Sequence, residues 1–125
     1  MPIHKILVVD DSKTELHHLS SLLGKAGYAV RTAENGEEAM RRLAEEKPDL
    51  ILMDVVMPGQ NGFQLTRAIT RDPRFADVPV IMLSSKDGLF DKARGRMVGS
   101  EDYLTKPFTK EQLLRAVDAY RRGAA

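Results

Sequence analysis

Two short apolar runs in this chain each lead directly into carboxylate side chains. The run 6–9 is followed by Asp10 and Asp11, and the run 50–53 is followed by Asp54. Short, continuous apolar runs are typical of parallel strands that are buried on both faces. Because the carboxyl ends of parallel strands meet at one edge of a sheet, where ligands bind, we expect the three aspartates to lie close together.

Three neighbouring carboxylates repel one another unless a cation offsets their charge. A hard divalent ion with oxygen ligands suits such a site, and Mg²⁺ is usually held by few carboxylates while it keeps several waters. The sequence therefore predicts a Mg²⁺ site that is formed by Asp10, Asp11 and Asp54.

Two further side chains that are able to take part in chemistry follow other predicted strands. Ser84 ends the apolar run 80–83, and Lys106 follows a short strand at 103–104. Mg²⁺ and a lysine around an aspartate are the groups needed for phosphoryl transfer to that aspartate, because both offset charge on the phosphoryl oxygens. The Ser84 hydroxyl is able to donate a hydrogen bond to one of these oxygens. The amino ends of the predicted strands carry no comparable cluster.

The elements that must position these residues alternate between strand and helix. Strands are predicted at 6–9, 29–33, 50–53, 80–83 and 103–104, and helices at 13–26, 36–47, 63–71 and from residue 110 onward. Ser12 and Thr109 each begin a capping box at a helix start. A further helix over 86–99 is expected to be weak, since this segment is charged and contains two glycines. The alternation predicts an α/β domain with helices on both faces of one parallel sheet.

The composition restricts the class of protein. The 125 residues suffice for one domain, 1–125, that buries roughly two-thirds of the surface of its unfolded chain. There are no cysteines, which excludes a disulfide framework and fits a reducing compartment. The net charge of +1 gives no general attraction to nucleic acid or to an anionic membrane. No apolar run approaches the ~20 residues of a membrane span, so we expect a soluble, cytoplasmic protein without a signal peptide.

In their order along the chain, these residues resemble the receiver domain of the response regulators of two-component systems. The matching positions are Asp10-Asp11, Asp54 with Met57-Pro58 behind it, Ser84, and Lys106-Pro107. The resemblance covers nearly the whole chain. It implies a flavodoxin-like, doubly wound sheet of five parallel strands in the order 2-1-3-4-5, flanked by five helices.

The resemblance also implies a role for each acidic position. Asp54 would accept a phosphoryl group from a histidine kinase or a phosphotransfer domain. Asp11 and Asp54 would bind Mg²⁺ directly, Asp10 would bind it largely through water, and Val56 would contribute its backbone carbonyl. Val56 is apolar where many receivers carry a polar side chain near the attacking water. We therefore expect slow loss of the phosphoryl group from Asp54.

The resemblance implies a switch beside these aspartates. Lys106 would pair with the phosphoryl group. Ser84 and Tyr103 would form the switch pair, in which the hydroxyl moves toward the phosphate and the ring turns inward behind it. Ser84 and Lys106 both lie next to the weak helix predicted over 86–99. The predicted output face therefore consists of that helix, the last strand and the last helix.

We expect no effector domain to follow the last helix, so the predicted output is a contact with a downstream protein target, made by a monomer or a weak dimer. The segments 53–59 and 84–88 look similar to stand-alone receivers of chemotaxis-like systems, including the twitching-motility branch that controls type IV pili. Action as a phosphate sink for a shared kinase stays open as an alternative.

Several residues also have simpler interpretations. His17 and His18 are adjacent on a predicted helix, where neighbouring side chains point about 100° apart and do not chelate one ion together. We interpret them as surface residues. Tyr103 packs equally well as a half-buried strand residue without a switching role. Acidic residues are interspersed among the basic residues of 92–96 and 121–122, which favours a solvated or partner-binding surface over a nucleic-acid patch.

Two other classes of function stay open at this point. A small Mg²⁺-dependent hydrolase with an aspartyl-phosphate intermediate would use similar groups. The haloacid-dehalogenase-like phosphatases, however, carry a second aspartate two residues after the nucleophile, where this chain has Val56. An interaction module with an unused pocket is the other class, and failure to bind Mg²⁺ would favour it.

Overall fold

In the computed structural model, the described residues are 3–54, 62–84, 102–105 and 108–123. Their elements in chain order are β1 (Lys5–Val9), α1 (Lys13–Lys25), β2 (Ala29–Ala33), α2 (Gly36–Glu45), β3 (Leu50–Asp54), α3 (Gly62–Thr70), β4 (Val80–Ser84), β5 (Asp102–Thr105) and α5 (Lys110–Gly123). The predicted alternation of strand and helix is confirmed. The weak helix predicted over 86–99 lies outside the described residues, so four of the five expected helices are seen among those that are described.

The five strands of the described chain form one parallel sheet in the order β2-β1-β3-β4-β5, as expected. The register places Val9 of β1 beside Ala33 of β2 and Met53 of β3. Asp54, the last residue of β3, lies beside Leu83 of β4. The carboxyl ends of the strands therefore meet at one edge of the sheet.

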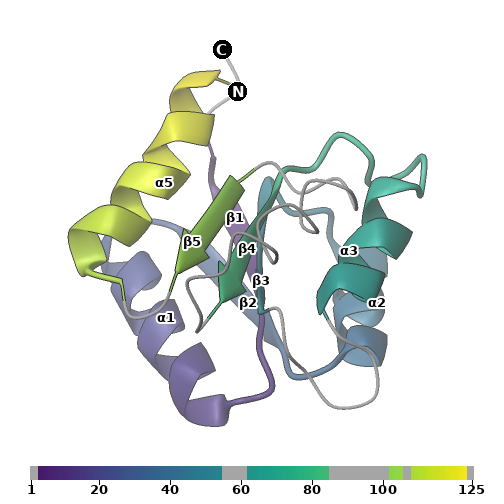
Figure 1. Ribbon diagram of the computed structural model, residues 1–125, viewed down its shortest axis with the longest axis horizontal. Helices are drawn as coiled ribbons and strands as arrows, with labels where there is room; N and C mark the ends of the chain where they lie inside the picture. The colour runs from purple at the N-terminus through teal and green to yellow at the C-terminus, as the bar shows by residue number, and fades with distance from the viewer. Residues whose placement is uncertain (1–2, 55–61, 85–101, 106–107, 124–125) are drawn as a thin grey trace.

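Helices cover both faces of this sheet (Figure 1), with α1 and α5 on one side and α2 and α3 on the other. Alternate strand residues face the two layers. We call the apolar residues on the second side the α2/α3 cluster; its strand members are Leu7, Val9, Ala33, Ile51, Met53, Val80 and Met82. Leu50 and Leu52 face α1 and α5 instead. Because both faces are covered, β3 is buried along its whole length, which explains why its sequence is continuously apolar.

The predicted capping boxes fix the starts of two helices that flank the sheet. The Ser12 hydroxyl accepts the backbone N–H of Glu15 at 3.3 Å. Thr109 and Gln112 bond reciprocally: the Gln112 N–H donates to the Thr109 hydroxyl at 3.1 Å, and the Thr109 N–H donates to the Gln112 side chain at 2.8 Å. These bonds satisfy N–H groups that have no partner within the helix.

The end of α1 differs by one residue from the prediction. The helix ends at Lys25, and Ala26 is its C-terminal cap. Gly27 then adopts a φ of 101°, a left-handed conformation that glycine tolerates best. Ala26, the last residue of the predicted helix, is exposed and lies beyond the last helical residue.

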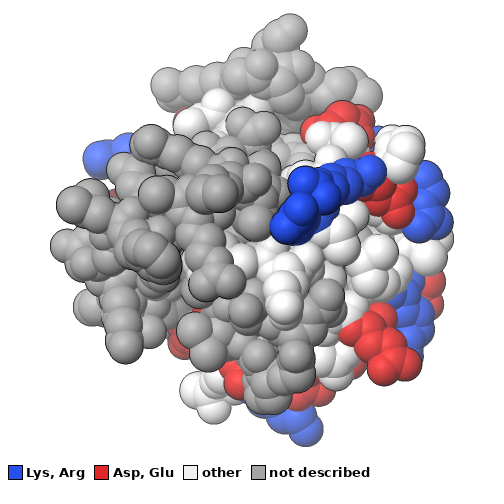
Figure 2. All heavy atoms as spheres, turned by 45° about the vertical axis from the view of Figure 1, so that its right-hand side comes forward, with Lys and Arg blue, Asp and Glu red and all other residues white. Residues whose placement is uncertain are grey.

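The surface over α2 and α3 carries charges of both signs. Figure 2 shows Lys and Arg side chains next to Asp and Glu side chains on the described part of this face. The exposed residues Glu37 and Arg41 of α2 and Arg67 of α3 contribute to this pattern. None of the helices in the described part of the chain has both the length and the hydrophobicity of a membrane span.

Candidate functional site

Asp10 is held at the point where the chain leaves the sheet. Its backbone N–H donates to the Ala33 carbonyl at 3.0 Å, which extends the β1–β2 pairing beyond Val9. Its side chain is 2% exposed, and one carboxylate oxygen accepts the N–H of Ser12 at 3.0 Å. We did not predict this bond, although aspartate commonly accepts an N–H two residues further on. The turn fixes the Asp10 carboxylate and begins α1.

Asp11 and Asp54 reach the same place from different elements. Asp11 is exposed and lies between Asp10 and the N-cap Ser12. Asp54 is the last residue of β3 and is 9% exposed. Its neighbour in β4 is Leu83, so the pairing of two buried strands places the Asp54 carboxylate at the carboxyl edge of the sheet.

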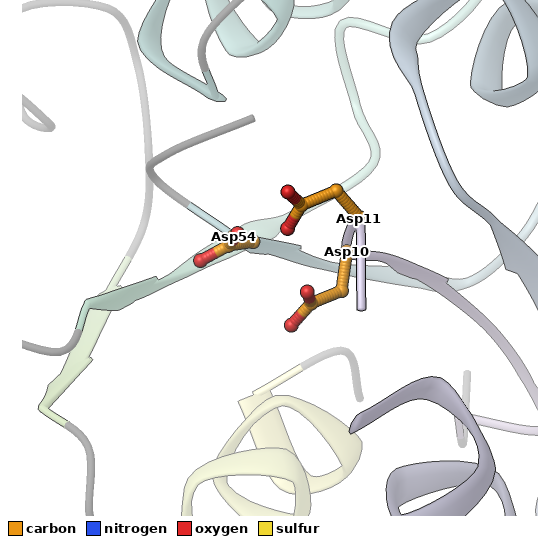
Figure 3. Close-up of side chains that lie close together, drawn as sticks. All are labelled: Asp10, Asp11 and Asp54. Carbon is orange, nitrogen blue, oxygen red and sulfur yellow. The ribbon is translucent and has the colours of Figure 1, made fainter. Parts of the chain in front are cut away.

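The three carboxylates form one cluster. One oxygen from each of Asp10, Asp11 and Asp54 lies within 4.8 Å of the others. Figure 3 shows the Asp10 and Asp11 side chains, which follow β1, next to Asp54 at the end of β3. Among the described residues, this is the only group of three or more acidic, histidine or cysteine side chains with such spacing. The juxtaposition predicted from the two apolar runs is therefore observed.

The donor set and spacing of the cluster fit a small, hard cation. Oxygens that bind one Mg²⁺ lie about 2.1 Å from it, so two of them are at most about 4.2 Å apart. A spread of up to 4.8 Å accommodates two direct carboxylate ligands and a third that acts through water. Carboxylates without nitrogen or sulfur ligands suit Mg²⁺, Ca²⁺ or Mn²⁺.

Ser84 and Tyr103 lie on the strands next to β3. Ser84 ends β4, is 3% exposed and is one residue beyond the neighbour of Asp54. Tyr103 of β5 lies beside Met82 and is half-buried against the α2/α3 cluster. Ser84 is thus at the same edge of the sheet as the carboxylates, whereas Tyr103 lies deeper along its strand.

The remaining predicted site residues are not all described. Val56 and Lys106 lie outside the described residues, so their predicted contributions stay predictions. His17 and His18 are both exposed on α1, as expected for surface residues. Neither belongs to the carboxylate cluster.

A protein-family comparison identifies the family of this chain. The family model described as "Response regulator receiver domain" matches residues 6–118. The chain belongs to this family. The match begins inside β1 and ends inside α5, so it includes every strand and each of the three clustered aspartates.

Two curated receiver relatives come from Pseudomonas aeruginosa. Protein PilH is 47% identical over 119 residues, an alignment that covers 95% of this chain and 98% of PilH. Protein PilG is 50% identical over 116 residues and is aligned over 93% of this chain and 86% of PilG. These alignments extend over nearly the whole chain.

Solved structures agree with this assignment. The chemotaxis protein CheY4 of Vibrio cholerae superposes with a TM-score of 0.90 at 34% identity, covering 94% of this chain and 98% of CheY4. A putative response regulator from Chloroflexus aurantiacus superposes with a TM-score of 0.91, also at 34% identity, over 98% of this receiver and 99% of that chain.

Proposed function

We propose that this receiver is a phosphoacceptor response regulator that takes a phosphoryl group onto Asp54 in a Mg²⁺-dependent reaction. The observation that carries the proposal is the cluster of three carboxylates within 4.8 Å at the carboxyl edge of a receiver sheet. Collecting like charges opposes folding, so such a cluster is best explained by a cation that it binds. The donor is a histidine kinase or a phosphotransfer domain.

Each carboxylate has a distinct task in this reaction. An Asp54 oxygen forms a bond to phosphorus while the bond from phosphorus to the donor imidazole nitrogen breaks, and the electron pair stays on that nitrogen. Asp11 and Asp54 would hold Mg²⁺ directly, Asp10 would hold it through water, and the Val56 carbonyl would complete the protein ligands. Mg²⁺ held there would offset charge on the phosphoryl oxygens. The N–H of Ser12, 3.0 Å from Asp10, keeps that carboxylate oriented.

The conformational response is assigned to Lys106, Ser84 and Tyr103. Lys106 follows β5 in the sequence and pairs with the phosphoryl group. The buried Ser84 hydroxyl moves toward the phosphoryl oxygens, and the half-buried Tyr103 ring turns inward behind it. This movement alters a face that consists of the segment before β5, β5 itself and α5. Phosphorylation thereby changes the affinity of that face for a downstream protein target.

The proposed pathway is chemotaxis-like and includes the twitching-motility branch. The similarity to the proteins named PilH and PilG, and to a structure described as a chemotaxis protein, supports this pathway. The proposed receiver is cytoplasmic, monomeric or weakly dimeric, and binds neither nucleic acid nor membrane. The mixed charges over α2 and α3 favour protein partners over a polyanion (Figure 2). Whether the phosphorylated form signals or drains phosphate from a shared kinase depends on its target.

The proposal is tested by intact mass after incubation with Mg²⁺ and a small acyl-phosphate donor. We expect one added phosphoryl group in the wild type and in Asp49→Asn, an aspartate variant at the opposite edge of the sheet. No adduct is expected in Asp54→Asn or when Mg²⁺ is chelated. An adduct that persists in Asp54→Asn contradicts the assignment of the phosphoacceptor.

The decay of the adduct tests the role of Val56. We expect decay over minutes or longer in the wild type and faster decay in Val56→Asn, because an amide is able to orient the attacking water. Decay within seconds in the wild type contradicts this expectation. Failure both to form an adduct and to bind Mg²⁺ would favour an unphosphorylated interaction module.

A further inference from the structure

One buried hydrogen bond connects α3 to the strand that ends in Ser84. The hydroxyl of Thr66 donates to the sulfur of Met82 at 3.2 Å, and both residues are 0% exposed. Thr70, one turn further along α3, donates instead to the Arg67 carbonyl of its own helix at 3.3 Å. The two threonines therefore provide a matched pair: one hydroxyl links two elements, and the other bonds within its helix.

A methionine sulfur is an unusual hydrogen-bond acceptor for a buried threonine hydroxyl. A thioether is a weak acceptor, and helical threonines commonly bond to a carbonyl one turn earlier. Methionine has three rotatable side-chain bonds and adapts readily to its surroundings. A hydroxyl that bonds to its sulfur restricts those rotations. The bond thus makes Met82 a fixed part of the interior rather than an adaptable one.

Met82 occupies a central position relative to the proposed switch. It precedes Ser84 by two residues, so both side chains point to the same face of β4. Its neighbours across the sheet are Met53 of β3 and Tyr103 of β5. Tyr103 is half-buried and packs against the α2/α3 cluster, to which Met82 belongs. The surface beneath the aromatic ring therefore includes the residue that Thr66 restrains.

We propose that Thr66 is a positioning residue for Tyr103. Its hydroxyl holds the Met82 side chain, and the fixed Met82 supports the packed position of the Tyr103 ring. Without the hydroxyl, Met82 regains rotational freedom and the ring loses a fixed neighbour. The ring then shifts toward its solvent-exposed position. The proposal rests on the proposed function for the meaning of this shift, since the ring position is what phosphorylation of Asp54 changes.

This arrangement gives α3 a part in the response although it is outside the predicted output face. A change in α3 that weakens the Thr66–Met82 bond reaches Tyr103 through two adjacent strands. The coupling uses a contiguous set of contacts: hydroxyl to sulfur, and methionine to the neighbouring ring. It requires no movement of the sheet.

The test is fluorine NMR of protein labelled with 3-fluorotyrosine. The chain has three tyrosines, and Tyr103→Phe identifies the Tyr103 signal by its absence. The fluorine shift between light and heavy water reports how far each ring is exposed. We expect Thr66→Val, which replaces the hydroxyl by a methyl group of similar size, to raise the ratio of exposed to packed Tyr103 about two- to tenfold. Thr66→Ser, which keeps the hydroxyl, should restore the wild-type signal.

Two further variants separate positioning from simple loss of stability. Thr70→Val is the matched control on the same helix and should leave the Tyr103 signal unchanged. Met82→Leu removes the sulfur at similar volume and should shift Tyr103 in the same direction as Thr66→Val. A Tyr103 signal that stays at its wild-type position in both Thr66→Val and Met82→Leu overturns the proposal, whatever the variants do to the melting temperature.

These measurements use the unphosphorylated protein, so their outcome is independent of whether Asp54 accepts a phosphoryl group. Failure of the proposed function appears separately, as the absence of an adduct by intact mass in the wild type. If the adduct forms, Thr66→Val should reduce the phosphorylation-dependent change in the Tyr103 signal. An undiminished change, together with an unshifted signal before phosphorylation, would assign Thr66 to packing alone.

Discussion

Acidic side chains have different surroundings at the two edges of the sheet, where the strands begin (the amino edge) and where they end (the carboxyl edge). At the carboxyl edge, Asp10, Asp11 and Asp54 place three like charges within 4.8 Å. At the amino edge, the Asp49 carboxylate accepts the backbone N–H groups of His4 and Lys5, both at 2.9 Å.

Ion pairs continue this pattern at the amino edge. The Lys5 ammonium lies 3.4 Å from Glu46, and Lys47 lies 2.8 Å from Asp77, just before β4. Among the described residues, the amino edge thus pairs its charges, whereas the carboxyl edge gathers three carboxylates.

This contrast separates stability from function within one fold. The acids of the amino edge bond to the chain and stabilise the strand starts. The acids of the carboxyl edge repel one another, and a bound cation offsets that cost. The same residue type therefore has opposite effects at the two edges. Substitutions of matched aspartates at the two edges measure this difference directly.

The largest expected effect is on Mg²⁺ affinity. Asp11→Asn removes one of the two proposed direct carboxylate ligands, and we expect the affinity for Mg²⁺ to fall by at least about a hundredfold. Loss of a hydrogen-bond partner of a metal ligand already lowers metal affinity about 10–100-fold. Titration calorimetry measures the change. Asp49→Asn, at the amino edge, should bind Mg²⁺ as the wild type does. Equal affinity in Asp11→Asn and the wild type would contradict the proposed ligand set.

The next effect is on stability at the amino edge. Asp49→Ala removes the acceptor of two backbone N–H groups, and we expect the free energy of unfolding to fall by about 1–2 kcal/mol. Urea denaturation measures this value from the midpoint at constant slope. Asp77→Ala, which removes an exposed ion pair with Lys47, should cost about 0.2–1 kcal/mol. A larger loss in Asp77→Ala than in Asp49→Ala would invert the expected ranking.

At the carboxyl edge, the effect on stability should have the opposite sign. Without divalent cations and at low salt, Asp11→Asn removes one like charge, and we expect the free energy of unfolding to rise by about 0.5–1 kcal/mol. With saturating Mg²⁺ the wild type should instead be the more stable of the two proteins, because only the wild type gains the full free energy of Mg²⁺ binding. Melting curves of both proteins, recorded with chelator and with Mg²⁺, show which protein is more stable under each condition. If Asp11→Asn is destabilised in chelator, the carboxylates of the cluster do not repel one another appreciably.

The general layout of the site could be predicted from the sequence because it depends on local patterns. The continuously apolar runs before Asp10 and Asp54 identify strands buried on both faces, and parallel pairing then brings their ends together. Capping residues such as Ser12 and Thr109 are recognisable because they bond to an N–H three residues away. In these cases, the partner is close in sequence or determined by topology.

Other features depend on positions that no sequence pattern specifies. The bond from Thr66 to Met82 joins residues 16 apart and requires particular rotamers of both side chains. The exposure of Ala26 depends on where α1 ends, which differs by one residue from the predicted end. The turn in which Asp10 accepts the Ser12 N–H had a local signal, but Ser12 was interpreted only as a helix cap. The contributions of Val56 and Lys106 stay predictions.

The smallest predicted effect is the pH dependence of one ion pair at the amino edge. The hydrogen bond from Lys47 holds the pKa of the Asp77 carboxyl below its ordinary value. A lowered folded-state pKa stabilises the protein above the ordinary value of about 4, and this contribution is lost as the pH falls through the folded pKa. Because the Asp77 side chain is 73% exposed, the contribution is only about 0.2–0.5 kcal/mol.

The difference in unfolding free energy between the wild type and Asp77→Asn measures this contribution. We expect it to be constant near neutral pH, to shrink below about pH 4, and to disappear near about pH 2. Since an exposed pair is screened, high salt should reduce the difference at neutral pH as well. A difference that persists unchanged into acid would show that Asp77 stabilises the chain through its shape or backbone contacts. Among the described residues, the charge balance of the amino edge would then rest on the ion pair of Lys5 with Glu46.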